Sequence, residues 1–310
     1  MPRYDLVSVG LTVVDMLARP VDGIPASGNV ALVEEIKLTP AGTAVAPAMA
    51  AARMGLRSAL VGAIGDDEMG EIVRRGLERR SVDTSLLQTA ALRTSATILP
   101  IRKNGDRPAL HAPGASLLLE LDDPEALLDT RFLHLGGVGT MPRLDGEPAA
   151  GLLEACRDRG VVTTCDLAPG AALIEPLAPV LPNLDYFMPT LDEAMALSEA
   201  KSAEAAAAFF LERGVGTCIF KDGANGSLLA DGGPIVRVPA FEVDVVDTSG
   251  CGDTYCGGFI TALAHDFSVE EGCRFASATA ALVATGLGSD AGLVSFDETL
   301  DAMNSLATRD

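Results

Sequence analysis

The segment 247–258, Asp-Thr-Ser-Gly-Cys-Gly-Asp-Thr-Tyr-Cys-Gly-Gly, contains residues whose types and order suit phosphate chemistry. Gly250 and Gly252 carry no side chain, so a backbone can approach an anion there, and the N–H groups of residues 250–253 can point at one place. If a helix begins here, that place is the positive end of its dipole, which favours a phosphate. Asp253 would lie beside the anion and accept the proton of an attacking hydroxyl. Alone, the segment is equally well explained as a capped helix N-terminus.

Three further glycine-rich turns follow or precede apolar segments. Residues 40–44 lead into an Ala-rich stretch and permit close approach of a ligand, although tight helix packing explains them more simply. Residues 61–67 are typical of a strand, a turn and a helix start. Residues 221–226, Lys-Asp-Gly-Ala-Asn-Gly, form a loop that can admit a nucleotide or be a plain turn. The sequence has no P-loop, no dinucleotide-binding fingerprint and no nucleophile elbow.

Short apolar runs alternate with helical stretches and predict the scaffold that positions these turns. This alternation predicts an α/β fold, doubly wound, with a mostly parallel sheet and helices on both faces. Strands are expected at 4–10, 59–64, 132–135, 161–165, 186–188, 217–220, 227–230, 235–238 and, just before the phosphate motif, 241–246. Helices are expected at 48–54, 68–80, 146–159, 191–199, 203–213 and over most of the chain after residue 250.

Two segments, 13–40 and 93–113, fall outside this alternation and read as extended. In the second, Asn104-Gly105 between β-prone runs is a strong hairpin signal. Pro100 and Pro108 indicate edge strands there. We therefore expect a small β-sheet lid attached to a single domain that spans residues 1–310.

Composition excludes several classes of partner. The chain has 23 Lys and Arg against 43 Asp and Glu, a formal net charge of −20, so nucleic acid and anionic membranes would be repelled and neither is expected. The six cysteines form no Cys-x-x-Cys pair and the three histidines are scattered, which predicts reduced thiols and no structural metal. We find no signal peptide and no bilayer-length apolar run, and we expect a cytoplasmic protein.

In this order and at this spacing, the motifs resemble those of the ribokinase-like (PfkB-type) carbohydrate kinase family, from Tyr4 to about Ser289. The resemblance implies ATP with Mg²⁺ as phosphoryl donor and a hydroxyl of a sugar, modified sugar or nucleoside as acceptor. It implies that Asp253 is the catalytic base and that the anion hole lies at residues 250–253, with Gly250, Cys251 and Gly252.

The resemblance also implies the remaining site residues and partners. The acceptor would be bound by Asp15, Gly42, Thr43, Ala46 and Asp253, the nucleotide by Thr190, Lys221, Gly223, Gly226 and Thr248, and Mg²⁺ by Glu193 through water. A monovalent cation near Asp247 and the loop 285–289 is left open. We also expect a homodimer formed through the lid.

Three positions depart from the family pattern. Ala46 and Thr190 stand where Asn is usual, and Ser116 follows Gly114-Ala115 where the family has Asn. Ala46 cannot hydrogen-bond an acceptor, and Gly136-Gly137 at the end of a strand remove side chains from the same expected wall. We therefore predict a larger acceptor pocket in which ribose and fructose are poor substrates.

Two alternatives remain from the sequence. A sugar- or nucleoside-binding regulator that kept the fold without catalysis is favoured by Ala46 and disfavoured by the intact Asp253 and anion hole. A nucleotide-dependent dehydrogenase is disfavoured by the absent fingerprint.

Overall fold

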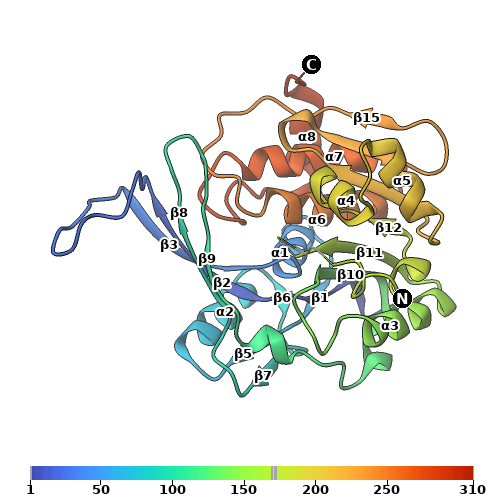
Figure 1. Ribbon diagram of the computed structural model, residues 1–310, viewed down its shortest axis with the longest axis horizontal. Helices are drawn as coiled ribbons and strands as arrows, with labels where there is room; N and C mark the ends of the chain where they lie inside the picture. Colours follow the sequence, from blue (N-terminus) through green and yellow to red (C-terminus); the bar gives the residue numbers. More distant parts are fainter. Residues whose placement is uncertain (1, 169, 171–172, 310) are drawn as a thin grey trace.

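The centre of the structure is a sheet of mostly parallel strands. The computed structural model describes residues 2–168, 170 and 173–309, and within them nine strands follow the order β15-β14-β13-β12-β11-β10-β1-β4-β6 (Figure 1). Neighbours from β6 to β13 pair in parallel, whereas β14 and β15 are antiparallel at one edge. The strands are β1 (Tyr4–Gly10), β4 (Ser58–Val61), β6 (Val82–Asp83), β10 (Thr130–Val138), β11 (Val162–Leu167), β12 (Tyr186–Phe187), β13 (Thr217–Lys221), β14 (Ser227–Ala230) and β15 (Val236–Val238).

Helices cover both faces of this sheet because successive strand side chains point to opposite sides. Val7 of β1 belongs to an apolar cluster with Leu152 of α3, whereas Leu6 clusters with Ala51 of α1 and Ile260 of α6. The expected doubly wound fold is confirmed. The helices are α1 (Val45–Arg53), α2 (Glu68–Glu78), α3 (Glu147–Asp158), α4 (Leu191–Ser198), α5 (Ala203–Leu211), α6 (Cys251–Ala264), α7 (Val269–Val283) and α8 (Phe296–Ser305), with 3₁₀ turns η1 (Ala115–Leu118), η2 (Pro124–Leu127), η3 (Leu181–Asn183) and η4 (Gly223–Asn225).

The winding of the sheet reverses at β1, which lies between β4 and β10. In open α/β sheets, ligands bind beside the carboxyl ends of the strands at such a reversal. The end of β1 at Gly10 and the end of β10 at Val138 therefore mark where a site is expected. Across the described residues, no helix combines the length and the apolar character needed to cross a membrane.

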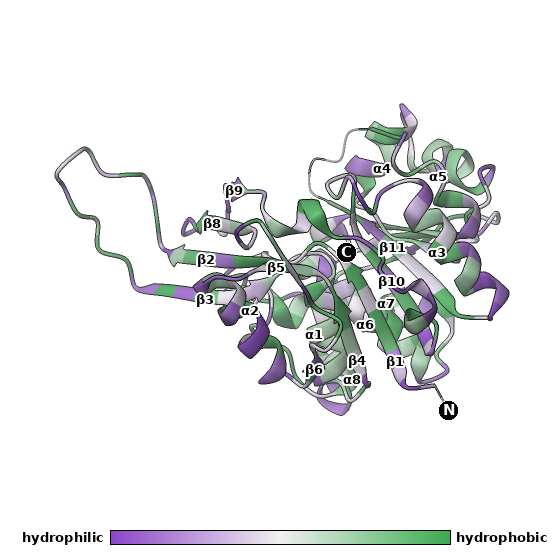
Figure 2. Cartoon of the chain, turned by 90° about the horizontal axis from the view of Figure 1, so that it is seen from below, coloured by the Kyte–Doolittle hydropathy of each residue, from purple (hydrophilic) through white to green (hydrophobic). Residues whose placement is uncertain are grey.

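A second sheet stands beside the first and confirms the expected small separate sheet. Its strands β2 (Val13–Arg19), β3 (Glu35–Ala41), β8 (Ala96–Pro100) and β9 (Leu110–Ala112) follow the order β3-β2-β8-β9. The loop 20–34 between β2 and β3 extends away from the rest of the chain (Figures 1 and 2). We call this four-stranded sheet the lid. Its pairing places Asp15 directly between Thr39 and Thr97, so one face carries a polar row.

Two expectations about strands were wrong. The segment 241–246 forms only an isolated bridge from Phe241 to Thr308, because the N–H of Val246 donates to the carbonyl of Ala284 at 2.8 Å instead of to a strand. The predicted strand 59–64 is split at Gly62, where a Cβ would lie 2.0 Å from the Thr12 hydroxyl. Its second half, β5 (Ala63–Gly65), pairs separately with β7 (Gln88–Ala90).

The predicted hairpin 94–111 exists, but its details differ. β8 pairs with β2 on one side and β9 on the other, so of the two hairpin strands β9 alone lies at an edge of the sheet. Pro100 is tolerated because it is the last residue of β8, where a missing N–H removes no inner ladder bond. Asn104 and Gly105 lie at the tip of a longer loop, closed by a bond from the Arg102 N–H to the Asp106 carbonyl at 2.9 Å.

Candidate active site

The predicted anion hole lies at the first turn of α6. Gly250 caps this helix with a φ of 71°, and a Cβ there would lie 2.2 Å from the Cβ of Ser289, so only glycine fits. The first N–H groups of a helix have no intrahelical acceptor. Among the described residues, Cys251 donates its N–H to the Thr248 carbonyl at 3.3 Å, and no protein acceptor accompanies those of Gly252 and Asp253. These groups are available to an anion.

Asp253 occupies the same turn as a half-buried side chain. Burial raises the pKa of its carboxyl group, the nearby Lys221 and Arg107 oppose the shift, and Glu193 adds to it; the net pKa lies above the ordinary value. A carboxylate with a raised pKa is a stronger base near neutral pH than an ordinary Asp. The geometry therefore suits the predicted role, which stays a prediction.

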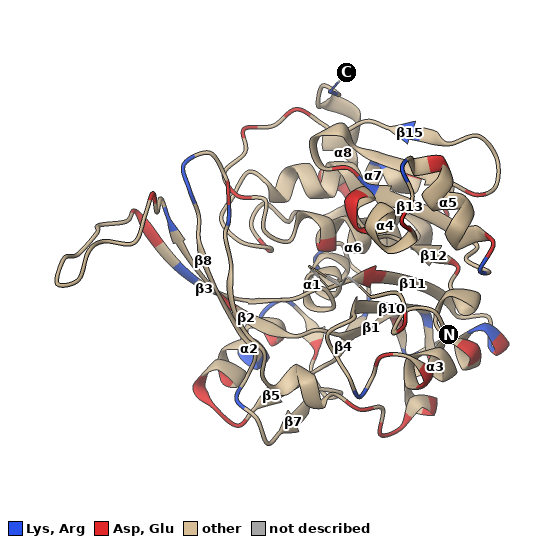
Figure 3. Cartoon of the chain, viewed as in Figure 1, with Lys and Arg blue, Asp and Glu red and all other residues tan. Residues whose placement is uncertain are grey.

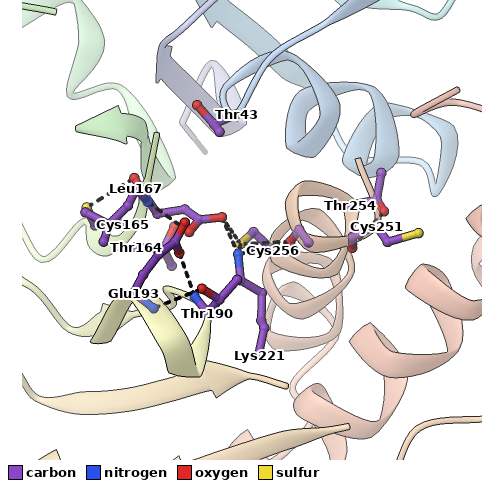
Figure 4. Close-up of polar contacts among 12 residues, drawn as sticks. Thr43, Thr164, Cys165, Leu167, Thr190, Glu193, Lys221, Cys251, Thr254 and Cys256 are labelled. Carbon is purple, nitrogen blue, oxygen red and sulfur yellow. Dashed lines mark hydrogen bonds and ion pairs between the residues drawn. The ribbon is translucent and has the colours of Figure 1, made fainter. Parts of the chain in front are cut away.

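A buried ion pair underlies this turn. Lys221, at the end of β13, donates to the Asp166 carboxylate of β11 and lies 3.4 Å from the Gly252 carbonyl (Figure 4). The two side chains are 9% and 3% exposed. Burial lowers the pKa of Lys221, but the Asp166 charge more than offsets this, so its pKa is raised. Sequence reasoning missed Asp166, although an acidic residue inside an apolar strand was a usable signal.

A cavity of about 430 Å³ opens beside the anion hole. It collects every predicted nucleotide residue: Thr190, Lys221, Gly223, Gly226 and Thr248, together with Cys251 and Gly252. Sequence reasoning missed its opposite wall, where α7 presents the small residues Ser277, Ala280, Ala281 and Ala284. Their spacing of three and four residues is that of one helix face, so the signal was present in the sequence.

Arg107 reaches this cavity from the lid. The loop between β8 and β9 contains several basic residues (blue in Figure 3), but Arg102 and Lys103 pair only with Asp106 and Asp22 among the described residues. The Arg107 Nε donates to the Thr248 hydroxyl at 3.1 Å. One lid guanidinium therefore lies on the nucleotide side of the site.

Glu193 begins α4 together with Thr190. The Thr190 hydroxyl accepts the Glu193 N–H, and one Glu193 carboxylate oxygen accepts the Thr190 N–H at 2.9 Å, a reciprocal cap (Figure 4). Thr in place of the usual Asn therefore preserves the helix start. Burial raises the pKa of Glu193. Within the described ranges no three His, Cys, Asp or Glu side chains form a metal cage. Mg²⁺ binds one or two carboxylates plus substrate phosphates, and Glu193 offers a half-buried carboxylate beside Thr190 of the cavity wall.

The predicted acceptor residues lie between the lid and α1. Asp15 is buried on the polar face of the lid and is electrostatically coupled to Asp253. Gly42 has a φ of 118°, and a Cβ there would lie 2.3 Å from the Leu11 carbonyl oxygen. The buried Thr43 hydroxyl has no hydrogen-bond partner among the described residues, as expected of a group that awaits a ligand. Ala46 is fully buried in α1, so its contact with an acceptor stays a prediction.

The Gly136-Gly137 pair does not enlarge the pocket. A Cβ at Gly136 would lie 2.3 Å from the Thr43 carbonyl oxygen, and one at Gly137 would lie 2.7 Å from the Leu11 Cβ. The two glycines let β10 pack closely against the turn that precedes α1. This part of the enlarged-pocket argument was wrong, and only Ala46 still supports it.

Asp15 gives the unliganded protein a predictable pH dependence. Burial raises its pKa from 3.8 to about 7, partly offset by a hydrogen bond with Thr97. Because the folded-state pKa exceeds the unfolded one, protonation favours the folded state; this stability is complete below the unfolded pKa of 3.8 and is lost as pH rises to about 7. Asp15→Asn should therefore unfold at a higher temperature than the wild type at about pH 8, and the difference should be smaller at about pH 5.

The measurement is thermal unfolding at both pH values. Asp5→Asn is the matched control, because hydrogen bonds from Arg57 lower the pKa of Asp5; this variant should lose stability at the higher pH. An Asp15→Asn variant that is less stable than the wild type at about pH 8 would contradict the conclusion that the buried, ionised Asp15 destabilises the folded state.

Comparison with known proteins finds sequence relatives and solved structures that match most of the chain. The chain is 28% identical over 270 residues to a ribokinase from Haemophilus influenzae, which covers 82% of this chain and 84% of the relative. It is 30% identical over 267 residues to an ATP-dependent ribose-1-phosphate kinase from Halopiger xanaduensis, over 85% and 86%. A ribokinase structure from Arabidopsis thaliana, complexed with ribose and ATP, has a TM-score of 0.81 at 21% identity, over 97% of this chain and 98% of that chain.

The fold of the chain is that of solved ribokinase structures. Residues 3–295 match the model of the pfkB family carbohydrate kinases. The chain belongs to that family, and the expected class of enzyme, a carbohydrate or nucleoside kinase, is confirmed.

Proposed function

We propose that this chain, as a single domain with a β lid, transfers the γ-phosphoryl group of ATP to a hydroxyl group of a sugar, modified sugar or nucleoside. One observation carries the proposal. Asp253 shares a helix turn with the N–H groups of Gly252 and Asp253, which have no acceptor among the described residues. Cys251 and Gly252 of that turn line the nucleotide cavity, and the charge of Asp253 acts on the buried Asp15 of the lid. The proposed base and the anion site therefore lie next to both the nucleotide cavity and the predicted acceptor residue Asp15.

The proposed reaction is an in-line transfer. Asp253 orients the acceptor hydroxyl and takes its proton, while the available N–H groups of the anion hole, those of Gly252 and Asp253, stabilise charge on the phosphoryl group. Glu193 would hold Mg²⁺ through water, and the ion would neutralise phosphate charge. Arg107 brings a further positive charge from the lid to the nucleotide side. Closure of the lid excludes water, which limits ATP hydrolysis.

ADP release with a panel of acceptors tests the proposal: ribose, deoxyribose, fructose, ribose 1-phosphate and adenosine. We expect at least one compound to stimulate turnover, because the base and the anion hole are complete. Because Ala46 removes a hydrogen-bond partner, ribose and fructose should not give the highest kcat/KM. A best kcat/KM with either sugar would refute the Ala46 argument. Binding without any turnover would favour the non-catalytic regulator.

We also propose that two chains associate through the outer face of the lid. Strand register aligns Leu38, Met16, Ile98 and Leu110 in one row across all four strands. Leu38, Ile98 and Leu110 are 46%, 48% and 65% exposed, and a contiguous apolar face of this kind is typical of an interaction surface. A second copy presents the same row and so matches it in an isologous contact.

Light scattering after size exclusion tests this association. The wild type should be dimeric, and Ile98→Asp should give monomers because a carboxylate would be buried at the centre of the row. Leu173→Asp is the control, since Leu173 is 66% exposed but lies outside the lid. A monomeric wild type, or a dimeric Ile98→Asp variant, would rule out this interface.

A further inference from the structure

The loop between α7 and α8 joins the lid to the anion hole by direct contacts. On the lid side, the ammonium group of Lys37 on β3 donates to the Leu287 carbonyl at 2.8 Å and to the Asp290 carboxylate at 2.9 Å. The Thr39 hydroxyl lies 3.3 Å from the same carboxylate. Lys37 is 26% exposed and Asp290 is 13% exposed, so these bonds are partly shielded from solvent and stronger than surface pairs.

The same loop contacts the anion hole on its other side. The N–H of Gly288 donates to one oxygen of Asp247 at 2.8 Å. The other Asp247 oxygen accepts the backbone N–H and the hydroxyl of Ser249, at 2.9 and 2.8 Å. Ser289 lies directly against Gly250. A displacement of residues 287–290 would therefore move the backbone that precedes the N–H groups of α6.

Apolar packing ties the loop to the lid as well. Leu287 forms a buried cluster with Leu17, Leu99 and Ile101, all of which belong to the lid strands or to the residue that follows them. Arg80, at the end of α2, provides a second cation for Asp290 from outside the lid. Asp290 is therefore held by one cation that belongs to the lid and one that does not.

We propose that Lys37 is a positioning residue for phosphoryl transfer: it holds residues 287–290 against Gly250 and thereby sets the N–H groups of the anion hole according to the position of the lid. The inference rests on the proposed kinase function. Lys37 contacts Leu287 and Asp290 of the loop and is not among the residues that line the nucleotide cavity, so it acts through the loop. The lid would then both cover the acceptor and complete the anion hole.

The same contacts bear on the monovalent cation that the family resemblance left open near Asp247 and residues 285–289. The Asp247 oxygens already accept donors from Gly288 and Ser249, and the Leu287 carbonyl accepts the Lys37 ammonium. A second cation beside this ammonium would be repelled. These residues do not fit a separate cation, and the wild type should turn over equally well in potassium and tetramethylammonium salts.

Lys37→Ala tests the role, assayed with the panel acceptor of highest kcat/KM. We expect kcat to fall by ~10-fold with the Kd for ADP unchanged within about two-fold, because transition-state positioning is lost and nucleotide binding is not. Lys103→Ala is the matched control, since this lid lysine is 73% exposed; its kcat should be unchanged. Arg80→Gln keeps the Lys37 contacts and should lower thermal stability while retaining kcat.

Two further readouts separate positioning from a structural role. Ethylammonium added to Lys37→Ala should restore part of the lost kcat, because a free ammonium can occupy the vacated position; it should not affect Lys103→Ala. Amide hydrogen exchange should quicken at residues 286–290 and 249–252 of Lys37→Ala and stay unchanged in β1. This exchange readout does not depend on any acceptor.

Three results would overturn the inference: wild-type kcat in Lys37→Ala, an equal loss of kcat in Arg80→Gln, or a wild type that requires potassium. A wild type that releases no ADP with any panel acceptor would instead refute the kinase function. In that case, unchanged exchange at residues 249–252 of Lys37→Ala would still count against the link between the lid and the anion hole.

Discussion

Asp253→Asn should lower kcat by ~10²–10⁴-fold, the usual contribution of a positioned general base. Asn has nearly the same shape but cannot accept the proton of the acceptor hydroxyl. The anion hole is made of backbone N–H groups and remains, so the Kd for ADP should change little. Asp244→Asn is the matched control, because Asp244 is exposed and lies between two residues of the cavity wall, Val243 and Val245; it should keep full turnover.

The pH profile gives this prediction a second readout. Burial raises the pKa of Asp253, so wild-type kcat/KM should fall on the acid side at a higher pH than for an exposed Asp, as the base becomes protonated. The raised folded-state pKa also means that stability decreases as pH rises through it. Asp253→Asn should therefore be at least as stable as the wild type at about pH 8. Near wild-type turnover in Asp253→Asn would remove Asp253 from the role.

The glycine-rich turn at the start of α6 was predictable because its signal is local. Gly250, Gly252 and Asp253 lie within one helix turn, and the chemistry of a helix N-terminus follows from these residue types alone. The mostly parallel, doubly wound sheet was also predictable, since apolar runs alternated with helical stretches. Thr190 departs from the Asn that is usual in the family, but Thr also caps helix N-termini, and its side chain caps α4.

What the sequence could not predict depends on contacts between distant segments. Asp166 and Lys221 are 55 residues apart, and Arg107 meets Thr248 across 141 residues. Such pairs become visible only when the sheet brings strand ends together. The Gly136-Gly137 pair was misread for the same reason, because the backbone and side-chain atoms that fill its space come from residues 11 and 43.

The run 241–246 was mistaken for a strand because its alternating valines have high β-propensity, and propensity is overridden by tertiary contacts. Its backbone donates to the end of α7 at Ala284. The run nevertheless has a place in the site, since Phe241, Val243 and Val245 form one wall of the nucleotide cavity. The alternating apolar residues of this run therefore line a cavity, where a ligand would cover them, and do not belong to a sheet.

Lys221→Met should destabilise the protein by about 3–5 kcal/mol, the usual cost of leaving one member of a buried ion pair without its partner. Asp166 is 3% exposed, and water cannot replace the lost ammonium. Asp166 would then take up a proton, because burial already raises its pKa. The loss should be greater at about pH 8 than at about pH 5, since a raised folded-state pKa costs stability as pH rises.

Urea unfolding at both pH values measures this loss, and two variants make it decisive. Lys221→Met combined with Asp166→Leu removes both charges and should regain most of the stability at about pH 8, since apolar side chains can replace a buried pair. Arg143→Met breaks the exposed pair with Glu120 and should cost less than about 1 kcal/mol. If the double variant were no more stable than Lys221→Met, the lost packing of the lysine side chain, and not the unpaired Asp166 charge, would explain the effect.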